Sequence, residues 1–362
     1  MDKRSILIGL HESPGIGWKK IAGILSGNDD WEHAPDFSPA DWMERGLESE
    51  LALRMSQGFT PSWIEARMEL MDRKGIRPIT VYDPSYPILM KETGRPPWVL
   101  YTIGDTKLLA SLSIAMIGTR VPTAYGRKVA TWLTEGLCAQ GVAIVSGLAR
   151  GIDGICHQAA LNAGGLTIAV LGTAIDVAYP REHAGLYRQI AERGLILSEY
   201  PVGTQGRPGM FPQRNRIIAG LSRGTVVVEA DVRSGSLITA DQALEEGRDV
   251  FAVPGPITSP KSRGTLGLIK QGAKLVMEPG DILEEYGPWL KGVSRETPPV
   301  ADVNELTIEE RRIYHMLEQG NTSFEGLMEE SGWDFGLLHS VLLSLIMKKA
   351  VVQLPGFVYK II

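Results

Sequence analysis

The run FPQRNR at residues 211–216 combines an aromatic ring with two guanidinium groups and an amide. An aromatic side chain can stack on an unpaired base, which contributes ~1–3 kcal/mol per base. Arginine donates forked hydrogen bonds to phosphate oxygens. A capped helix with two solvated arginines would not need Phe-Pro directly before them. We therefore interpret Phe211, Arg214, Asn215 and Arg216 as candidate contacts to a single-stranded nucleic acid.

Two glycine-containing loops could hold phosphate groups. The segment GTR at residues 118–120 places a hydroxyl and the Arg120 guanidinium before a predicted helix, an arrangement suited to a phosphate. The segment SGLARGID at residues 146–153 offers the backbone donors of Ser146 and Gly147. Its aspartate is explained as a helix cap, and the histidine four residues later as a packed helix residue. Each loop alone is a weak signal, because such turns are common on structural grounds.

Positive charges recur just after the predicted strands, although the whole chain is acidic. The formal net charge is −5, so the protein as a whole repels polyanions. Nucleic-acid binding would therefore need a focused groove, and a bulk charge-driven coat is disfavoured. The cations that could gather in such a groove are Arg120, Arg150, Arg181, Arg214, Arg216, Lys261 and Arg263.

Strands and helices must position these residues. Short β-branched stretches alternate with amphipathic segments such as residues 123–140, which carries Val129, Leu133 and Leu137 on one face. This alternation predicts an α/β, Rossmann-like domain whose parallel sheet is covered on both faces. Ligands bind beyond the carboxyl ends of such strands, where the strand order reverses. The predicted strands are residues 113–117, 142–145, 167–171, 195–198, 225–229 and 250–253.

Changes in composition and hydrophobic pattern along the sequence predict an N-terminal helical module, a Rossmann-like domain, a polar linker and a C-terminal winged helix. Their ranges are 1–80, 81–288, 289–305 and 306–362. In the first, SPGIGWKKI at 13–21 is typical of a helix–hairpin–helix turn, which brings backbone N–H groups to a phosphate, or of an ordinary connector. In the last, a capping box begins the first of three predicted helices, and a β-hairpin follows the third. This winged helix is not notably basic, which favours a protein-interaction or regulatory role.

Signatures of metal sites, cofactors and membrane segments are missing from the sequence. It contains no G-x-G-x-x-G fingerprint, Walker loop, C-x-x-C or H-E-x-x-H, so we expect no cofactor, no metal site and no catalytic residue. Cys138 and Cys156 are expected to be reduced and buried. No apolar run reaches the ~20 residues of a spanning helix, and the N-terminal segment lacks the apolar h-region and cleavage site of a signal peptide. We expect a cytoplasmic protein without membrane contact.

Several of these motifs together resemble the DprA/Smf family of DNA-processing proteins. The resemblance is strong over residues 82–286 and looser over the terminal modules. It rests on GTR at 118–120, SGLARGID at 146–153, YP at 179–180, FPQRNRIIAGLS at 211–222, SGSLITA at 234–240 and VPG at 253–255.

The resemblance implies a non-enzymatic recombination mediator for natural transformation. Such proteins form homodimers, bind and protect incoming single-stranded DNA, and load the RecA recombinase while displacing single-strand-binding protein. Carried over by position, the implied DNA contacts are Arg120, Arg181, Arg214, Asn215 and Arg216, with backbone support from Ser146 and Gly147 and stacking on Phe211. This chain departs from the family pattern in a longer N-terminal region and in Met210, which replaces a frequent Asn.

Two other classes of protein remain as alternatives. A Rossmann nucleotide-processing hydrolase would use Glu199 or Glu229 as its catalytic carboxylate, but the paired-glycine signature of those enzymes is missing. A winged-helix transcription regulator would need a basic recognition helix. The segment 334–349 offers only His339, Lys348 and Lys349 for that role.

Overall fold

The computed structural model describes residues 1–26, 31–287, 306–318, 320, 322–348, 350–354 and 357–361. The chain divides into two compact units, Met1–Val293 and Ser294–Ile362. The linker predicted at 289–305 lies outside the described residues. Within the described part of the chain, no helix is both long and apolar enough to cross a bilayer.

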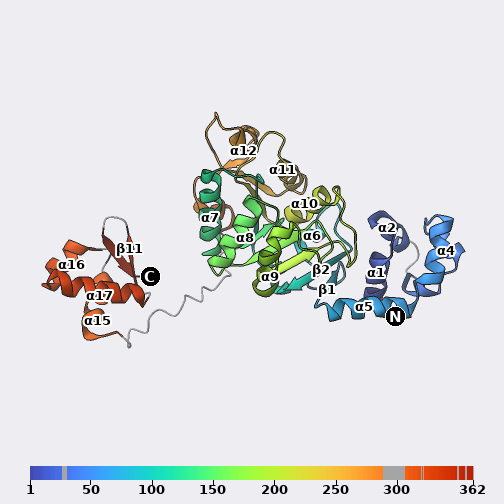
Figure 1. Ribbon diagram of the computed structural model, residues 1–362, viewed down its shortest axis with the longest axis horizontal. Coiled ribbons are helices and arrows are strands. Elements are labelled where there is room, and N and C mark those ends of the chain that lie inside the picture. The colour runs from blue at the N-terminus through green and yellow to red at the C-terminus, as the bar shows by residue number, and fades with distance from the viewer. Residues whose placement is uncertain are drawn as a thin grey trace. The chain divides into compact units, whose positions relative to one another are not determined.

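The first unit is built on a nine-stranded sheet of order β1-β2-β6-β5-β4-β3-β7-β8-β9 (Figure 1). All neighbouring strands from β6 to β9 are parallel, whereas β2 runs antiparallel to both β1 and β6. The predicted Rossmann-like α/β fold is thus confirmed. The strands are β1 (Arg77–Thr80), β2 (Val99–Gly104), β3 (Ser113–Ile117), β4 (Ala143–Ser146), β5 (Thr167–Leu171), β6 (Leu195–Ser198), β7 (Gly224–Val227), β8 (Asp249–Ala252) and β9 (Lys274–Leu275).

Helices cover both faces of this sheet, because alternate strand residues point to opposite sides. In β3, Ala115 and Ile117 face a core shared with α6, α10, α11 and α12, whereas Ile114 and Met116 face one shared with α7, α8 and α13. These helices are α6 (Ile88–Lys91), α7 (Ala124–Cys138), α8 (Ile152–Asn162), α9 (Ala184–Arg193), α10 (Met210–Leu221), α11 (Gly235–Glu245), α12 (Pro260–Lys270) and α13 (Pro279–Leu283). Short 3-10 helices are η2 (Thr106–Ala110), η3 (Arg181–His183) and η4 (Glu284–Tyr286).

The N-terminal helices share a hydrophobic core with the sheet. Ile8 and Ile64 belong to the same buried cluster as Tyr101 of β2 and Leu171 of β5. Residues 1–80, which the sequence predicts as a separate module, therefore pack within the first unit. Their helices are α1 (Lys3–Glu12), α2 (Trp18–Leu25), η1 (Trp31–Asp36), α3 (Pro39–Glu44), α4 (Ser49–Gly58) and α5 (Pro61–Arg73).

The second unit has its own small core of three helices and a three-stranded sheet. The predicted capping box is present, since Glu310 N–H donates to the Thr307 hydroxyl and Thr307 N–H donates to the Glu310 carboxylate. The three helices and the terminal hairpin that the sequence predicts are present, and the structure adds the short strand β10 between the first two helices. The elements are α15 (Ile308–Glu318), β10 (Thr322–Ser323), α16 (Phe324–Ser331), α17 (Phe335–Met347), β11 (Val351–Leu354) and β12 (Val358–Ile361).

Candidate nucleic-acid interface

A cleft of about 1130 Å³ opens at the carboxyl ends of the strands. The chain leaves β3 outward through β4, β5 and β6, then returns to β7 on the other side of β3, so the strand order reverses there. The residues after β3, β5 and β7 and one face of α10 line the cleft. It therefore occupies the topological switch point, the usual ligand site of an open parallel sheet.

The rim of the cleft carries the exposed guanidinium of Arg120 and two aromatic rings. Arg120 follows β3 and is exposed, and no carboxylate pairs with it in the described part of the chain. Phe211 and Tyr179 lie with their ring centroids 5.0 Å apart. Asn215 also lines the cleft. A cation and partly exposed rings that line one cleft can contact the phosphates and the bases of one strand.

Arg214 belongs to the floor of the cleft and not to its rim. Only 5% of this residue is exposed. Its Nη1 group donates hydrogen bonds to the carbonyl oxygens of Gly147 (2.7 Å) and Val170. Burial lowers the pKa of Arg214 to about 10, although nearby Asp153 partly opposes that effect. The exposed phosphate contact predicted at this position does not fit the burial, since the guanidinium is already committed to backbone oxygens.

Gly147, which accepts a hydrogen bond from Arg214, and Ser146 before it lie at the end of β4. The N–H group of Gly147 donates to the Asp153 carboxylate (3.1 Å), and a Cβ atom at Gly147 would lie 2.6 Å from Arg214 Nη2. Only glycine allows the guanidinium to approach this closely. The hydroxyl of Ser146, fully buried, donates to the Met116 carbonyl (2.6 Å). Both residues therefore belong to the floor, and the Gly147 N–H group, which the sequence predicts as a donor to a bound strand, is already bonded to Asp153.

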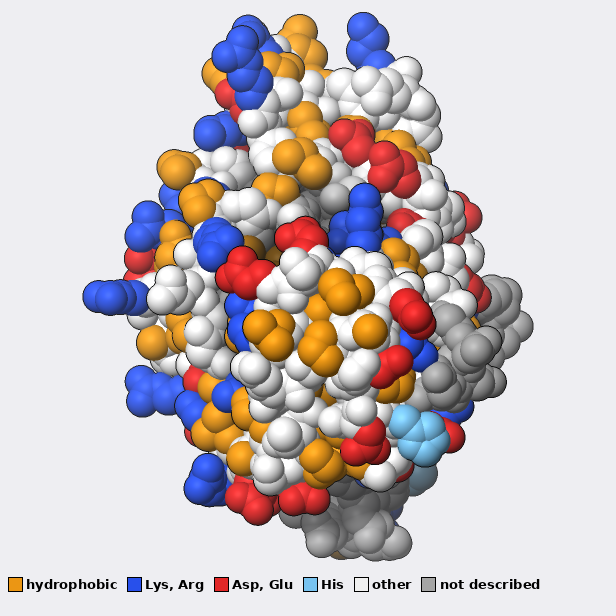
Figure 2. Space-filling view, turned by 90° about the vertical axis from the view of Figure 1, so that its right-hand side faces the viewer, with side chains coloured by type: hydrophobic (Ala, Val, Ile, Leu, Met, Phe, Trp, Pro, Cys, Tyr) orange, Lys and Arg blue, Asp and Glu red, His pale blue; other side chains and the backbone are white. Residues whose placement is uncertain are grey.

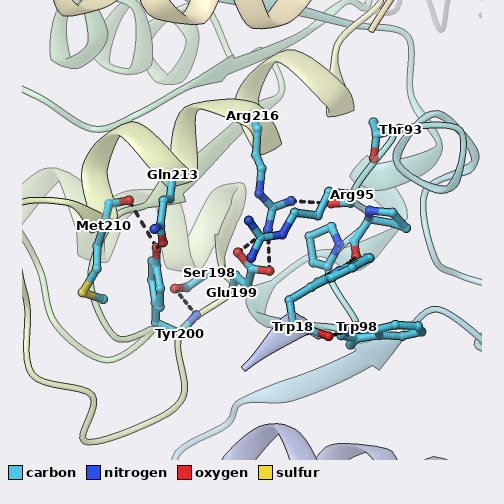
Figure 3. A network of polar contacts seen from close by, with 12 residues as sticks. Trp18, Thr93, Arg95, Trp98, Ser198, Glu199, Tyr200, Met210, Gln213 and Arg216 are labelled. Atoms are coloured by element: carbon cyan, nitrogen blue, oxygen red, sulfur yellow. Dashed lines mark hydrogen bonds and ion pairs between the residues drawn. The ribbon is translucent and has the colours of Figure 1, made fainter. Parts of the chain in front are cut away.

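Arg216 points away from the cleft. Successive helical residues are turned by about 100°, so Phe211, Asn215 and Ile218 share one face of α10 while Arg216 lies on another. Figure 3 shows Arg216 facing Glu199 beneath the helix, with a hydrogen bond to the Arg95 carbonyl (2.8 Å). Its guanidinium is therefore paired with a carboxylate and a backbone oxygen, and the structure does not bring it to the other predicted contacts.

The remaining predicted cations are dispersed. Arg181 is exposed on η3 and does not line the cleft, and Arg150 pairs with Glu182 at the surface. Lys261 approaches the Thr119 hydroxyl (3.4 Å) beside β3, whereas Arg263 is exposed on α12. Of the seven cations, Arg120 alone is both exposed and part of the cleft lining within the described residues.

Sequence reasoning missed several lining residues. Arg207 is exposed and lines the cleft from the loop after β6, and Ser234, Ser236 and Thr239 line it at the start of α11. A glycine- and proline-rich loop is a weak signal for a contact, because its path depends on the tertiary structure. The SGS segment at 234–236 is visible as a motif in the sequence, but the motif alone does not indicate a ligand contact.

Carboxylates and nucleophiles near the cleft have structural partners. Glu229 is buried and accepts hydrogen bonds from the N–H group (2.9 Å) and the hydroxyl of Thr123, which caps α7. The segment GLSRG at 220–224 fits the G-x-S-x-G pattern, but Ser222 is buried at the end of α10 and donates to the Ile218 carbonyl. Among the described residues, no group of three His, Cys, Asp or Glu side chains could hold a metal ion.

Comparison with known proteins identifies the family. The sequence model of DNA recombination-mediator protein A matches residues 77–287, more than half of the chain. The chain belongs to this family. Its relatives in the DprA/Smf group include DNA processing protein DprA of Bacillus subtilis, 47% identical over 59% of this chain and 72% of that protein. Protein Smf of Escherichia coli is 44% identical over 66% of this chain and 64% of its own length.

Solved DprA structures share the fold. The X-ray structure of DprA from Streptococcus pneumoniae superposes with a TM-score of 0.69 at 36% identity, covering 79% of this chain and 99% of that one. A structure of Helicobacter pylori DprA, described by its single-stranded DNA binding mode, gives a TM-score of 0.53 at 33% identity over 59% of this chain and 96% of that one. The matched DprA/Smf region, 77–287, contains every residue of the cleft.

Proposed function

We propose that this protein binds single-stranded DNA in the cleft at the switch point of the sheet. The observation that carries the proposal is the rim of this cleft, whose volume is about 1130 Å³. Exposed Arg120 lines it together with the rings of Phe211 and Tyr179. The Asn215 amide lines it as well. Guanidinium groups bind phosphates, and aromatic faces bind unpaired bases. The single-stranded DNA binding mode of the Helicobacter pylori relative supports the same ligand class.

The charge distribution favours a focused contact. On the face in Figure 2, Lys and Arg side chains are interspersed with Asp and Glu side chains and with apolar patches. The formal net charge of −5 adds no long-range attraction for a polyanion. Binding would therefore depend on the few unpaired cations at the cleft, and its salt dependence would be modest.

We propose further that the bound strand is protected and passed to a RecA-type recombinase, in the cytoplasm and during uptake of foreign DNA. Family membership supports this role, and a homodimer, an exchange with single-strand-binding protein and the absence of catalysis belong to the same proposal. The structural partners of Glu199 and Glu229 favour a binding protein over a hydrolase. Formation of recombinase filaments on strands coated with single-strand-binding protein measures the transfer.

The first test is fluorescence anisotropy with labelled oligothymidine and with a blunt duplex of equal length. We expect tighter binding of the single strand, because Phe211 and Tyr179 can stack only on unpaired bases. The Phe211→Ala variant should lose about 1–2 kcal/mol of single-strand affinity. The matched control is Trp132→Ala, which removes an aromatic ring 47% exposed on α7, outside the cleft.

Equal affinity of the wild-type protein for duplex and single strand would contradict stacking in the cleft. A Phe211→Ala variant that binds oligothymidine as the Trp132→Ala control does would contradict the assignment of the rim. Thermal unfolding of each variant separates a loss of binding from a loss of folded protein.

A further inference from the structure

A second cleft of about 940 Å³ lies between the N-terminal helices and the loop that follows β6. One side is formed by the turn between α1 and α2, residues Ser13 to Ile16, together with Trp63 and Arg67 of α5. The other side is formed by Tyr200 and by Gln213 of α10. This cleft contains the helix–hairpin–helix-like turn, which the proposed function leaves without a role.

The two clefts share a wall. Thr204, Gln205 and Arg207 line both of them, so the loop after β6 separates the DNA cleft from the second one. Arg207 is exposed, and no carboxylate pairs with it in the described ranges. A strand leaving the first cleft over this loop would meet an unpaired guanidinium on the crest and then enter the second cleft.

The lining of the second cleft is suited to a nucleic-acid strand. Trp63 and Tyr200 are partly exposed rings, and Gln213 is an exposed amide. At the turn, Gly15 has φ +90°. The next helix, α2, has no side-chain cap, and Lys19 and Lys20 lie in its first turn. These lysines follow Ile16, the last residue of the turn that lines the cleft, by three and four residues.

Glu12, the one carboxylate among the described residues that line the second cleft, is already paired with a cation. The Glu12 side chain is fully buried and is paired with Arg67. Arg67 also donates to the Val202 carbonyl (3.2 Å), which ties α5 to the shared loop. The Tyr200 hydroxyl donates to the Met210 carbonyl (3.2 Å), so the opposite wall is tied down as well (Figure 3). Both walls are thus held in place.

We propose that the second cleft is a further single-stranded DNA site, which takes the continuation of the strand bound in the first cleft. Arg207 contacts the backbone where the strand crosses the loop, and Trp63 and Tyr200 offer stacking faces beyond it. This inference rests on the proposed function, because it needs the first cleft to hold a strand. It assigns the N-terminal helices to binding as well as to the core.

A length series of labelled oligothymidines tests the second cleft, with probes from about 4 to about 16 nucleotides. Wild-type affinity should rise until both clefts are filled and then level off. The Trp63→Ala variant should bind short probes as the wild type does, bind long probes about tenfold more weakly, and level off at a shorter length. Trp132→Ala serves as the matched control, because its ring lies outside both clefts.

Trp63 packs partly against the core, so a second variant guards against misfolding. Gln213→Glu places a carboxylate on an exposed position of the second cleft. It should lower the affinity for long probes about fivefold and leave the affinity for short probes unchanged. If both variants weaken short and long probes equally, or neither changes the length at which affinity levels off, the second site is wrong. If the wild type binds no probe, the proposed function itself fails.

Discussion

The floor and the rim of the main cleft use the same types of residue for different purposes. On the floor, Arg214 is buried, donates to two backbone carbonyls and lies near Asp153. On the rim, Arg120 is exposed and has no carboxylate partner within the described residues. A guanidinium whose donors are satisfied inside the protein stabilises the fold, whereas one left in solvent can bind a ligand. The two arginines therefore differ in function, although the sequence predicts both as cations of the same groove.

Substitution of the floor arginine should have the largest effect, and the effect should be on stability. Arg214→Ala leaves the carbonyl oxygens of Gly147 and Val170 without their donor and leaves buried Asp153 without its neighbouring cation. We expect a loss of about 3 kcal/mol in the free energy of unfolding, measured by urea denaturation.

Arg214→Lys is the matched control for charge. Its ammonium keeps the positive charge but cannot reproduce the forked donor geometry, so its loss should be intermediate. If Arg214→Ala unfolds at the wild-type urea concentration while DNA affinity falls, Arg214 is a ligand contact and the distinction between floor and rim fails.

A fall in pH should also lower the free energy of unfolding, through the buried side chain of His157. His157 is fully buried on α8 beneath the cleft, with Nδ1 2.7 Å from the Thr167 hydroxyl. Burial, with repulsion from His183 and Arg214, lowers the pKa of His157 to about 3. Below pH 6.5 the unfolded chain takes up a proton that the folded protein does not, so stability is lost as the pH falls from 6.5 toward 3. At pH 5 this loss is about 2 kcal/mol for His157.

The His157→Gln variant should reduce the change in unfolding free energy between pH 7 and pH 5 by about 2 kcal/mol. His11, which is half-buried and whose pKa burial lowers to about 4, keeps part of the acid sensitivity in that variant. Substitution of exposed His33 by Gln should leave the wild-type pH dependence in place. An unchanged pH dependence in His157→Gln would mean that the buried, neutral imidazole of His157 does not cause the loss of stability in acid.

Local patterns predicted the central part of the fold well. The strands at 113–117, 167–171 and 195–198 match β3, β5 and β6, because runs of buried apolar residues bounded by turns are distinctive. The capping box at Thr307 is equally local, since its partners are three residues apart. The strands β1, β2 and β9 were not predicted. The short strands β1 and β9 lie at the two edges of the sheet, and β2 joins the sheet by antiparallel pairing with β6, which is far along the chain.

The candidate site was predicted in place but not in detail. Which way an arginine of α10 points depends on the helical phase, and that phase is set by the packing of Ile217 and Ile218 against the sheet. Arg214 is therefore directed inward and Arg216 toward Glu199, although both lie in one motif. The pairing of Arg214 with carbonyls that are 44 and 67 residues away has no local signature.

Substitution on the rim should have a smaller effect, confined to binding. Arg120→Ala should leave the free energy of unfolding unchanged within about 0.5 kcal/mol, because the side chain is exposed. Single-strand affinity should fall by about 1–2 kcal/mol with loss of a charge-assisted contact. The salt dependence should flatten by about 0.7–1 in slope, as expected for one phosphate contact.

Arg73→Ala removes an exposed guanidinium from α5, outside the main cleft, and is the matched control for a change in net charge. Equal losses of affinity in Arg73→Ala and Arg120→Ala would point to a diffuse electrostatic effect and would remove the distinction between rim and surface. A loss restricted to Arg120→Ala, with a flatter salt dependence, would locate a phosphate at the carboxyl end of β3. The floor would then set the shape of the cleft, and the rim would set its affinity.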